Sequence, residues 1–436
     1  MTDTMQQYND YVITSIVKAV QPIVVASAQG CVIRDASGKD YLDCFAGISV
    51  VNAGHCNPKV IAAAKAQMEK LVHCASYIYH SPATGEFAEK LAQIMPSPRL
   101  RKSFFANSGA EAVEGALKAA RLFTSKHEVI SLQASFHGRT WGTLSITGNH
   151  GRKRRGGPYA PGVTFIPAPY VYRSPWPDDP DRCVDFWCQS LDDAIRFSTA
   201  GDVGAFIAEP VMGEGGIIVP PPGYFRSIKQ VLDRHGILFI ADEVQSGFGR
   251  TGKMFAIEHY GVEPDILVTA KGIADGFPLA AFTTRDEIAA SFRPGDHLST
   301  FGGNPVSCAA ALANIEFMLE EQLCEHALDK GAYLLGRLKD RHRDLPLIGE
   351  VRGLGLMIGI ELVADGNRTP APAEAEAVRD HCLANGVLVG VGGVYGNVVR
   401  LQPPLVITRE QLDQAAETVT LAIRQAQAKH LAPARS

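Results

Sequence analysis

Two short apolar runs that end in charged residues constrain the fold of this chain more than any other feature. Residues 237–241 read ILFIA and precede Asp242 and Glu243, whereas residues 266–269 read ILVT and lie two positions before Lys271. Fully apolar runs of this length are typical of strands buried on both faces of a parallel sheet. Open α/β sheets bind ligands beyond the carboxyl ends of their strands. The sequence therefore predicts an α/β protein in which an acid and a lysine face one crevice.

Such a pair suggests a definite chemistry. A lysine desolvated at a sheet edge has a lowered pKa and can act as a nucleophilic amine toward an aldehyde cofactor. An acid close by, such as Asp242, could hold a protonated pyridine nitrogen and so make a cofactor ring a better electron sink. On residue types alone a second interpretation stays open, in which Lys271 only begins a helix at the surface.

Periodicity and turn residues predict the other elements. A hairpin is expected at residues 30–43, with its turn at 35–39. Helices are expected at 58–71, 111–123, 309–321, 324–342 and 410–427, and strands at 103–106, 129–132, 203–208, 279–283, 351–356, 357–362 and 398–401. The turn at Ser108, Gly109 and Ala110 opens a long helix, and a helix N-terminus suits a phosphate, although Ser-Gly is also an ordinary cap.

Seven separated stretches resemble the class III, or omega, pyridoxal-phosphate-dependent aminotransferases. In chain order they read NSGAEAVEGALKAAR, FHGRT, AEPVMGEGG, ADEVQSGFGRTG, PDILVTAKGI, STFGGNP and NVVRLQPPL. Within this family the chain is similar to the 4-aminobutyrate and omega-amino acid aminotransferases. It implies the fold-type I architecture: a large domain with a mostly parallel seven-stranded sheet, and a smaller α+β domain built from both termini. Residues 1–57 and 311–436 would form the small domain, and residues 58–310 the large one.

The resemblance also assigns a cofactor, pyridoxal 5'-phosphate, and the residues that hold it. Lys271 and Asp242 would be catalytic, the lysine as covalent anchor and proton carrier and the acid as partner of the pyridine nitrogen. The further cofactor contacts implied are Ser108, Gly109, Ala110, Phe136, His137, Glu209, Val244, Gln245 and Thr300. Thr300 would reach the site of a neighbouring subunit, so the resemblance implies a homodimer with shared sites, which could pair into a tetramer.

Four residues are implied on the substrate side. Ile48 would lie near the cofactor, where dialkylglycine decarboxylases carry glutamine, so it counts against decarboxylation. Arg139 would bind the distal carboxylate of an omega-amino acid, or alternatively pair with a surface acid. Arg400 would pair with Glu209 while an amine donor is bound, and turn to the α-carboxylate of a keto acid.

Composition and charge restrict the partners. The net charge of -4 gives no general attraction to nucleic acid or to an anionic membrane. Nine scattered cysteines without a C-x-x-C pair favour reduced thiols in the cytoplasm, and no metal site is expected. The first residues, MTDTMQQYNDYV, do not have the pattern of a secretory signal.

The expected function is transfer of an amino group from an omega-amino acid or related amine, of the 4-aminobutyrate or β-alanine type, to pyruvate or 2-oxoglutarate by a ping-pong mechanism. The alternatives are another carbanion chemistry on the same fold, namely an amino acid racemase, a dialkylglycine-type decarboxylase or a phospho-lyase. A non-catalytic protein on this fold is the third possibility, and the presence of Lys271 with Asp242 counts against it.

Overall fold

A seven-stranded sheet forms the centre of the molecule. The computed structural model describes residues 2–13, 21–342 and 344–431. The strands lie in the order β4 (Lys102–Ala106), β10 (Ala280–Thr284), β9 (Ile266–Thr269), β8 (Leu238–Asp242), β7 (Val203–Ala208), β5 (Glu128–Leu132) and β6 (Val163–Ile166). Strand β10 pairs antiparallel with β4 and β9, and the other neighbours pair parallel. The predicted mostly parallel seven-stranded sheet is confirmed.

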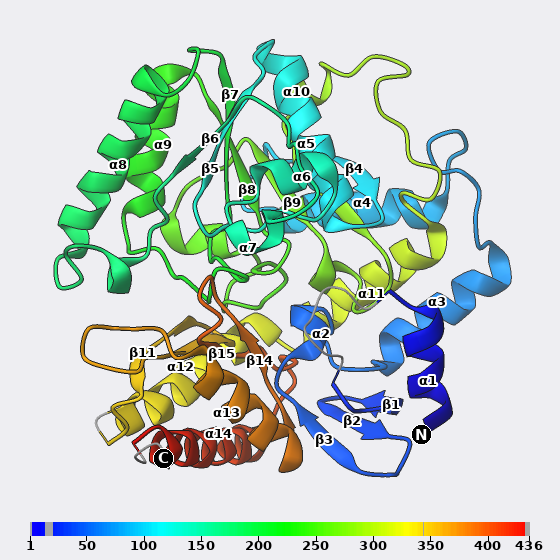
Figure 1. Ribbon diagram of the computed structural model, residues 1–436. Helices are drawn as coiled ribbons and strands as arrows, with labels where there is room; N and C mark the ends of the chain where they lie inside the picture. The colour runs from blue at the N-terminus through cyan, green and yellow to red at the C-terminus, as the bar shows by residue number, and fades with distance from the viewer. Residues whose placement is uncertain (1, 14–20, 343, 432–436) are drawn as a thin grey trace.

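The inner strands β7, β8 and β9 are buried along their whole length, and almost all of their residues are apolar. Ile240 packs into the cluster below helix α5 (Gly109–Thr124), whereas Phe239 and Ala241 pack into the larger cluster on the other face. Figure 1 shows α8 (Pro180–Phe197) and α9 (Tyr224–His235) covering that other face. Since successive side chains of a strand point to opposite faces, only an uninterrupted apolar run satisfies both layers.

The two ends of the chain build two smaller sheets, which lie together below the large sheet in Figure 1. The first has the order β1 (Val25–Gln29), β2 (Val32–Asp35), β3 (Asp40–Asp43) and β13 (Val387–Leu388), and β13 joins β3 in parallel. The second has the order β11 (Ile348–Leu354), β12 (Met357–Leu362), β15 (Val398–Leu401) and β14 (Gly390–Gly392). The domain boundaries given from the sequence stay a prediction.

The remaining elements are helical. They are α1 (Thr2–Tyr11), α2 (Ala46–Ser49), α3 (Pro58–Lys70), α4 (Pro82–Ile94), α6 (Trp141–Ile146), α7 (His150–Lys153), η1 (Val171–Arg173), η2 (Ala256–Tyr260), η3 (Lys271–Ile273), α10 (Asp286–Ala289), α11 (Pro305–Glu320), α12 (Leu323–His342), α13 (Pro372–Ala384) and α14 (Arg409–Leu431). Within the described ranges, no helix is long and apolar enough to cross a membrane.

Most predicted elements are present, with shifted ends. Strands β7 and β9 have the predicted bounds, and β8 is displaced by one residue. Helix α11 begins at Pro305 rather than at the predicted 309, because Asn304 caps it: its Oδ1 accepts hydrogen bonds from the amides of Val306 and Ser307. Proline in the first turn after an Asn cap is a strong start signal.

Candidate active site

Three parallel strands deliver an acid, a second acid and a lysine to one edge of the large sheet. Glu209 follows β7, Asp242 ends β8, and Lys271 lies two residues beyond β9. Both acids are buried, with 5% and 3% of their surface exposed. Because the carboxyl ends of parallel strands meet at the same edge, the three charged groups lie near one another.

Lys271 is a half-buried lysine that interacts with several charged groups. Its backbone has a φ of 47°, in the left-handed region, and this turn takes the chain from β9 into η3. Burial lowers the pKa of Lys271, and the carboxylates of Asp242 and Glu209 oppose that shift. A lysine with a lowered pKa has a larger neutral fraction, and the neutral amine is the nucleophile and the base.

Asp242 is held from two sides. Its Oδ2 lies 2.7 Å from Nδ1 of His137, and its Oδ1 accepts a hydrogen bond of 3.1 Å from the amide of Val244. The backbone of His137 is itself fixed, because its amide donates to Oγ1 of Thr147 over 3.0 Å. These bonds favour one orientation of the Asp242 carboxylate.

The N-terminus of α5 lies next to Val244. Oγ of Ser108 caps the helix by accepting a hydrogen bond of 3.3 Å from the amide of Glu111. A Cβ atom on Gly109 would lie 3.1 Å from both methyl carbons of Val244. The absence of a side chain at Gly109 therefore lets the helix end approach the pocket, where its amides and the helix dipole suit a phosphate.

Glu209 joins the loops that follow two strands. Its Oε1 accepts a hydrogen bond from the amide of Phe136, and its Oε2 accepts one from the amide of Gly213, both over 2.9 Å. Burial raises the pKa of Glu209 to about 7, and the nearby charge of His137 and the two amides act against the rise. Glu209 thus positions the Phe136 loop against the site.

The structure corrects the predicted partner of Arg400. Nη1 of Arg400 lies 3.7 Å from Oε2 of Glu214, and Nη2 donates to the carbonyl of Val391 over 3.2 Å. The predicted pair of Arg400 with Glu209 is wrong, because Glu209 uses both of its oxygens on backbone amides. Glu214 lies in the quoted stretch AEPVMGEGG but was not singled out there.

Arg400 is buried and incompletely bonded. Its guanidinium lies 5.3 Å from the ring centre of Phe45, and a Cβ on Gly392 would come within 2.7 Å of its central carbon. Among the described residues, its Nε and Nη1 have no hydrogen-bond partner. A buried guanidinium with unused donors is suited to bind a planar carboxylate.

Glu214 contacts a second arginine, Arg152, in addition to Arg400. Oε1 of Glu214 accepts a hydrogen bond of 3.0 Å from Nε of Arg152, and a further bond joins it to Nη2. Arg152 belongs to the basic run RKRR at residues 152–155. Nothing in the linear sequence indicates that this loop folds back onto the GEGG stretch.

The other predicted site residues differ in exposure. Gln245 is buried, with 8% of its surface exposed, and Val244 and Phe136 are half-buried. Ile48 is 42% exposed in α2 and has a left-handed φ of 70°. Arg139 and Thr300 are exposed in the single chain, so their predicted roles stay predictions.

The groups of this crevice fit the parts of pyridoxal phosphate. Lys271 offers a buried amine to its aldehyde, and Asp242 offers an oriented carboxylate to its ring nitrogen. The start of α5 offers backbone amides to its phosphate, and Gly109 leaves the required space. The same crevice also contains Arg400, which can receive a carboxylate of a substrate.

Comparison with known proteins agrees with this arrangement. The family model described as aminotransferase class-III matches residues 15–423. An acetylornithine aminotransferase of Methanosarcina mazei is 43% identical over 92% of this chain and 91% of its own length. A probable 4-aminobutyrate aminotransferase of Bacillus subtilis is 36% identical over 97% and 98%, and a leucine/methionine racemase of Thermococcus litoralis is 40% identical over 92% and 90%.

The fold has close counterparts among solved structures. A thermostable (S)-enantioselective omega-transaminase from Thermomicrobium roseum superposes with a TM-score of 0.92 and is 36% identical, with 98% of each chain covered. Likeness at this level extends over both the large sheet and the two small sheets.

Proposed function

Because this chain belongs to the class III aminotransferase family and is a pyridoxal-phosphate-dependent aminotransferase, we propose that its donor is an omega-amino acid or a related amine and its acceptor an α-keto acid. The observation that carries this proposal is the pair of Arg400 and Glu214. Their closest approach is 3.7 Å, so a buried cation is neutralised without being fully bonded.

The cofactor, when bound, supplies an electron sink for the charge that develops at the substrate carbon bearing the amine. The residues of the chain supply the rest. Lys271 would hold the cofactor through its amine and would carry a proton to and from that carbon as acid and base. Asp242, oriented by His137, holds a proton at the ring nitrogen. The start of α5 with Ser108, Gly109 and Ala110 binds the phosphate.

The Arg400–Glu214 pair allows one pocket to accept two kinds of substrate. A donor with no carboxylate beside its amine leaves the pair intact, so no buried charge is left alone. A keto acid such as pyruvate or 2-oxoglutarate presents an α-carboxylate, which takes the place of Glu214 on Arg400. Arg139 and Ile48 form the distal side of the pocket in this proposal, with Arg139 as the partner of a distal carboxylate.

The donor class has further support. 4-Aminobutyrate and N-acetylornithine, named for two of the relatives, both carry a primary amine on a terminal carbon, and β-alanine shares this feature. The racemase among the relatives supports a second candidate, because exchange of a proton at an α-carbon needs the same lysine and the same electron sink. Transfer to a keto acid distinguishes the two.

The active unit is proposed to be a homodimer in the cytoplasm, with two dimers forming a tetramer as the alternative. Apolar side chains are exposed on two neighbouring segments, Ile78 and Tyr79 at 66% each, and Leu298 and Phe301 at 67% and 62%. The rings of His73 and Phe301, 5.4 Å apart, join the two segments. An apolar surface of this kind favours association, which would bring Thr300 to the site of the partner. Nine free thiols are consistent with a reducing compartment.

The test is a spectral titration of the loaded enzyme. 4-Aminobutyrate, β-alanine, N-acetylornithine and L-alanine are added in turn, followed by pyruvate or 2-oxoglutarate. Loss of the yellow absorbance with a donor, and its return with a keto acid, is expected, and it ranks donors and acceptors together. Racemisation of L-leucine or L-methionine without such a cycle would contradict transamination and favour the second candidate.

A further inference from the structure

The carboxylate of Glu214 is shared between two arginines that contact different oxygens. Arg152 bonds to Oε1, with Nε at 3.0 Å, whereas Nη1 of Arg400 lies 3.7 Å from Oε2. Arg400 can therefore turn away without disturbing the bonds that Arg152 makes. Glu214 itself is partly buried, with 20% of its side chain exposed, so an unpaired negative charge there would be costly.

The backbone on both sides of this pair is fixed. The Glu214 loop is held by the amide of Gly213 on Glu209 and by the carbonyl of Gly216, which accepts hydrogen bonds of 3.1 and 2.6 Å from Arg352. The carbonyl of Glu214 accepts a further bond of 3.2 Å from the amide of Gly393. The loop therefore has little freedom, and the change of partner must occur in side chains.

Arg152 is equally well placed from its own side. It lies in the short helix α7, whose start is capped by Asn149: Oδ1 of Asn149 accepts a hydrogen bond of 3.1 Å from the amide of Gly151. The amide of Asn149 donates to the carbonyl of Ser135 over 3.0 Å, just beyond β5. A Cβ on Gly148 would lie 2.0 Å from the carbonyl oxygen of Leu132, so this loop is tightly packed on the strand.

We propose that Arg152 is a positioning residue that keeps Glu214 paired when Arg400 leaves it for the carboxylate of a keto acid. The proposal rests on the proposed function, in which Arg400 exchanges Glu214 for a substrate carboxylate. Without Arg152, the released Glu214 would be a half-buried charge with no arginine beside it, and it would either retain Arg400 or take up a proton. Arg152 thus lowers the cost of the keto-acid half-reaction and has little effect on an amine that leaves the Arg400–Glu214 pair intact.

The charges around Glu214 indicate how the affinity for a keto acid should change with pH. Arg400 on β15, Arg152 on α7 and Lys271 beyond β9 all lower the pKa of Glu214, against the effect of its burial. In the native protein Arg152 stays beside Glu214 when Arg400 turns away, so we expect the affinity for a keto acid to depend little on the titration of Glu214. In Arg152→Gln, keto-acid binding should be coupled to proton uptake by Glu214, and affinity should weaken as the pH rises.

The experiment compares Arg152→Gln with Arg155→Gln, which removes an exposed charge from the same basic run, and with Arg152→Lys. The reaction rate is measured against pyruvate concentration with enzyme that carries the amine form of the cofactor. It is measured against donor concentration with enzyme that carries the aldehyde form, in both cases between pH 6.5 and 8.5. Equal melting temperatures of the variants confirm intact folding. We expect the KM for pyruvate of Arg152→Gln to rise about tenfold over the native value at pH 8 and to approach the native value at low pH. In Arg152→Lys the KM should lie between these two values.

Two results would overturn the inference. One is a KM for pyruvate in Arg152→Gln that equals the KM of Arg155→Gln at every pH. The other is a rise by the same factor for donor and keto acid, which would indicate a structural role alone. If the native enzyme does not react with pyruvate, the proposed function fails. The role of Arg152 is then decided by spectral titration with propionate, a carboxylate without a keto group, whose binding should weaken in Arg152→Gln alone.

Discussion

Nδ1 of His137 lies 2.7 Å from Oδ2 of Asp242, and each of the two residues has only 3% of its surface exposed. The imidazole cannot move without displacing the carboxylate, because the backbone of His137 is bonded to Thr147. The orientation of the acid that faces the ring nitrogen is therefore set by a residue from a different strand end, the loop after β5.

Replacing His137 by phenylalanine should preserve volume and remove this bond. We expect kcat/KM to fall about 10- to 100-fold, the range found when a group that orients a catalytic ligand is removed. The measurement is steady-state kinetics with the best donor, with the exposed His127→Phe as control. Unchanged activity would mean that the amide of Val244 is sufficient to orient Asp242.

Reduction with borohydride should fix the cofactor to Lys271. Only a covalent link between the cofactor and an amine is trapped in this way, so peptide mass spectrometry should find the added mass on the peptide that contains Lys271. Lys271→Ala should lose both the adduct and about 10²- to 10⁴-fold or more of the activity, the usual contribution of a positioned acid–base group. Lys253→Ala, at an exposed lysine, is the matched control. An adduct on another lysine would contradict the assignment.

Replacing Glu243 by glutamine should stabilise the protein at high pH only. Burial raises the pKa of Glu243 to about 7, although its oxygens accept hydrogen bonds from Ser246 and from the amide of Ile257. Because the pKa of Glu243 is higher in the folded than in the unfolded state, protonated Glu243 contributes to the stability of the folded protein. This contribution is complete below the unfolded-state pKa and is lost as the pH rises through 7. The amide stays neutral throughout.

The advantage of Glu243→Gln over the native protein should therefore be small at pH 5 and grow toward pH 8.5, to on the order of 3 kcal/mol. Thermal melting or urea unfolding at several pH values measures it, and Glu69→Gln, at an exposed site, should show no such trend. An advantage independent of pH would show that Glu243 does not titrate in this range.

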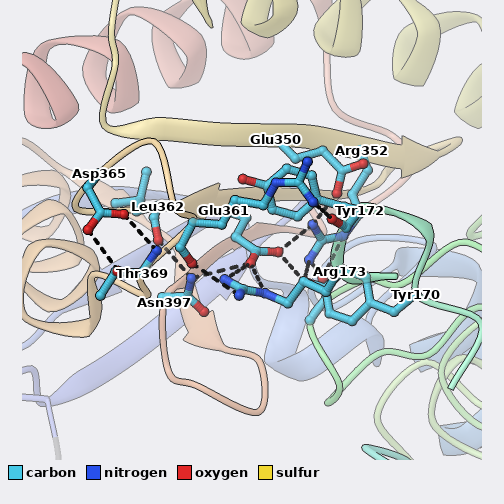
Figure 2. A network of polar contacts seen from close by, with 12 residues as sticks. Tyr170, Tyr172, Arg173, Glu350, Arg352, Glu361, Leu362, Asp365, Thr369 and Asn397 are labelled. Carbon is cyan, nitrogen blue, oxygen red and sulfur yellow. Dashed lines mark hydrogen bonds and ion pairs between the residues drawn. The ribbon is translucent and has the colours of Figure 1, made fainter. Parts of the chain in front are cut away.

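The cluster around Glu361 should be a main contributor to stability. Figure 2 shows Arg352 and Arg173 converging on this carboxylate, which is fully buried and also bonded to Tyr170. Nη1 of Arg352 lies 2.7 Å from Oε2 of Glu361, and Nε of Arg173 lies 2.6 Å from Oε1. Removing one partner of such a buried pair leaves an undercompensated charge.

Arg352→Met should lower the free energy of unfolding by about 3 kcal/mol or more, measured by urea unfolding. The same substitution should also raise the KM for the keto acid, because Arg352 holds the carbonyl of Gly216 in the Glu214 loop. Arg379→Met, which breaks a surface pair with Asp380, should change neither quantity appreciably. A loss of stability without any change in keto-acid affinity would separate the cluster from the site.

Strands and the reacting residues were predictable because their signal is local. The run at 203–208 is followed directly by Glu209, and the run at 266–269 is followed after one alanine by Lys271, so each apolar run is closed by a charged residue at the edge of the sheet. Helix α8 was missed, although Asp179 and Pro180 give it an ordinary cap and first turn. The short strands β1, β13 and β14 were missed because their pairing depends on partners far along the chain.

The choice of Glu209 over Glu214 failed for a different physical reason. Both glutamates follow the same strand, five positions apart, and the sequence does not reveal where the loop turns back. The turn depends on left-handed backbone at Gly216 and Ile217, with φ values of 117° and 54°. Ile217 does not favour such a φ, so the turn is imposed by tertiary contacts such as those from Arg352. Sequence reasoning identified the arginine and not its counter-charge.

The parallel pairing of β3 with β13 has a consequence for synthesis of the protein. Lys271 and Asp242 are translated well before the chain ends, but Arg400 lies on β15, and the strand that completes the N-terminal sheet begins at Val387. A nascent chain can thus contain every residue proposed to contact the cofactor before Arg400, proposed to bind the keto acid, has been added. The enzyme becomes able to complete its catalytic cycle only when the last strands leave the ribosome.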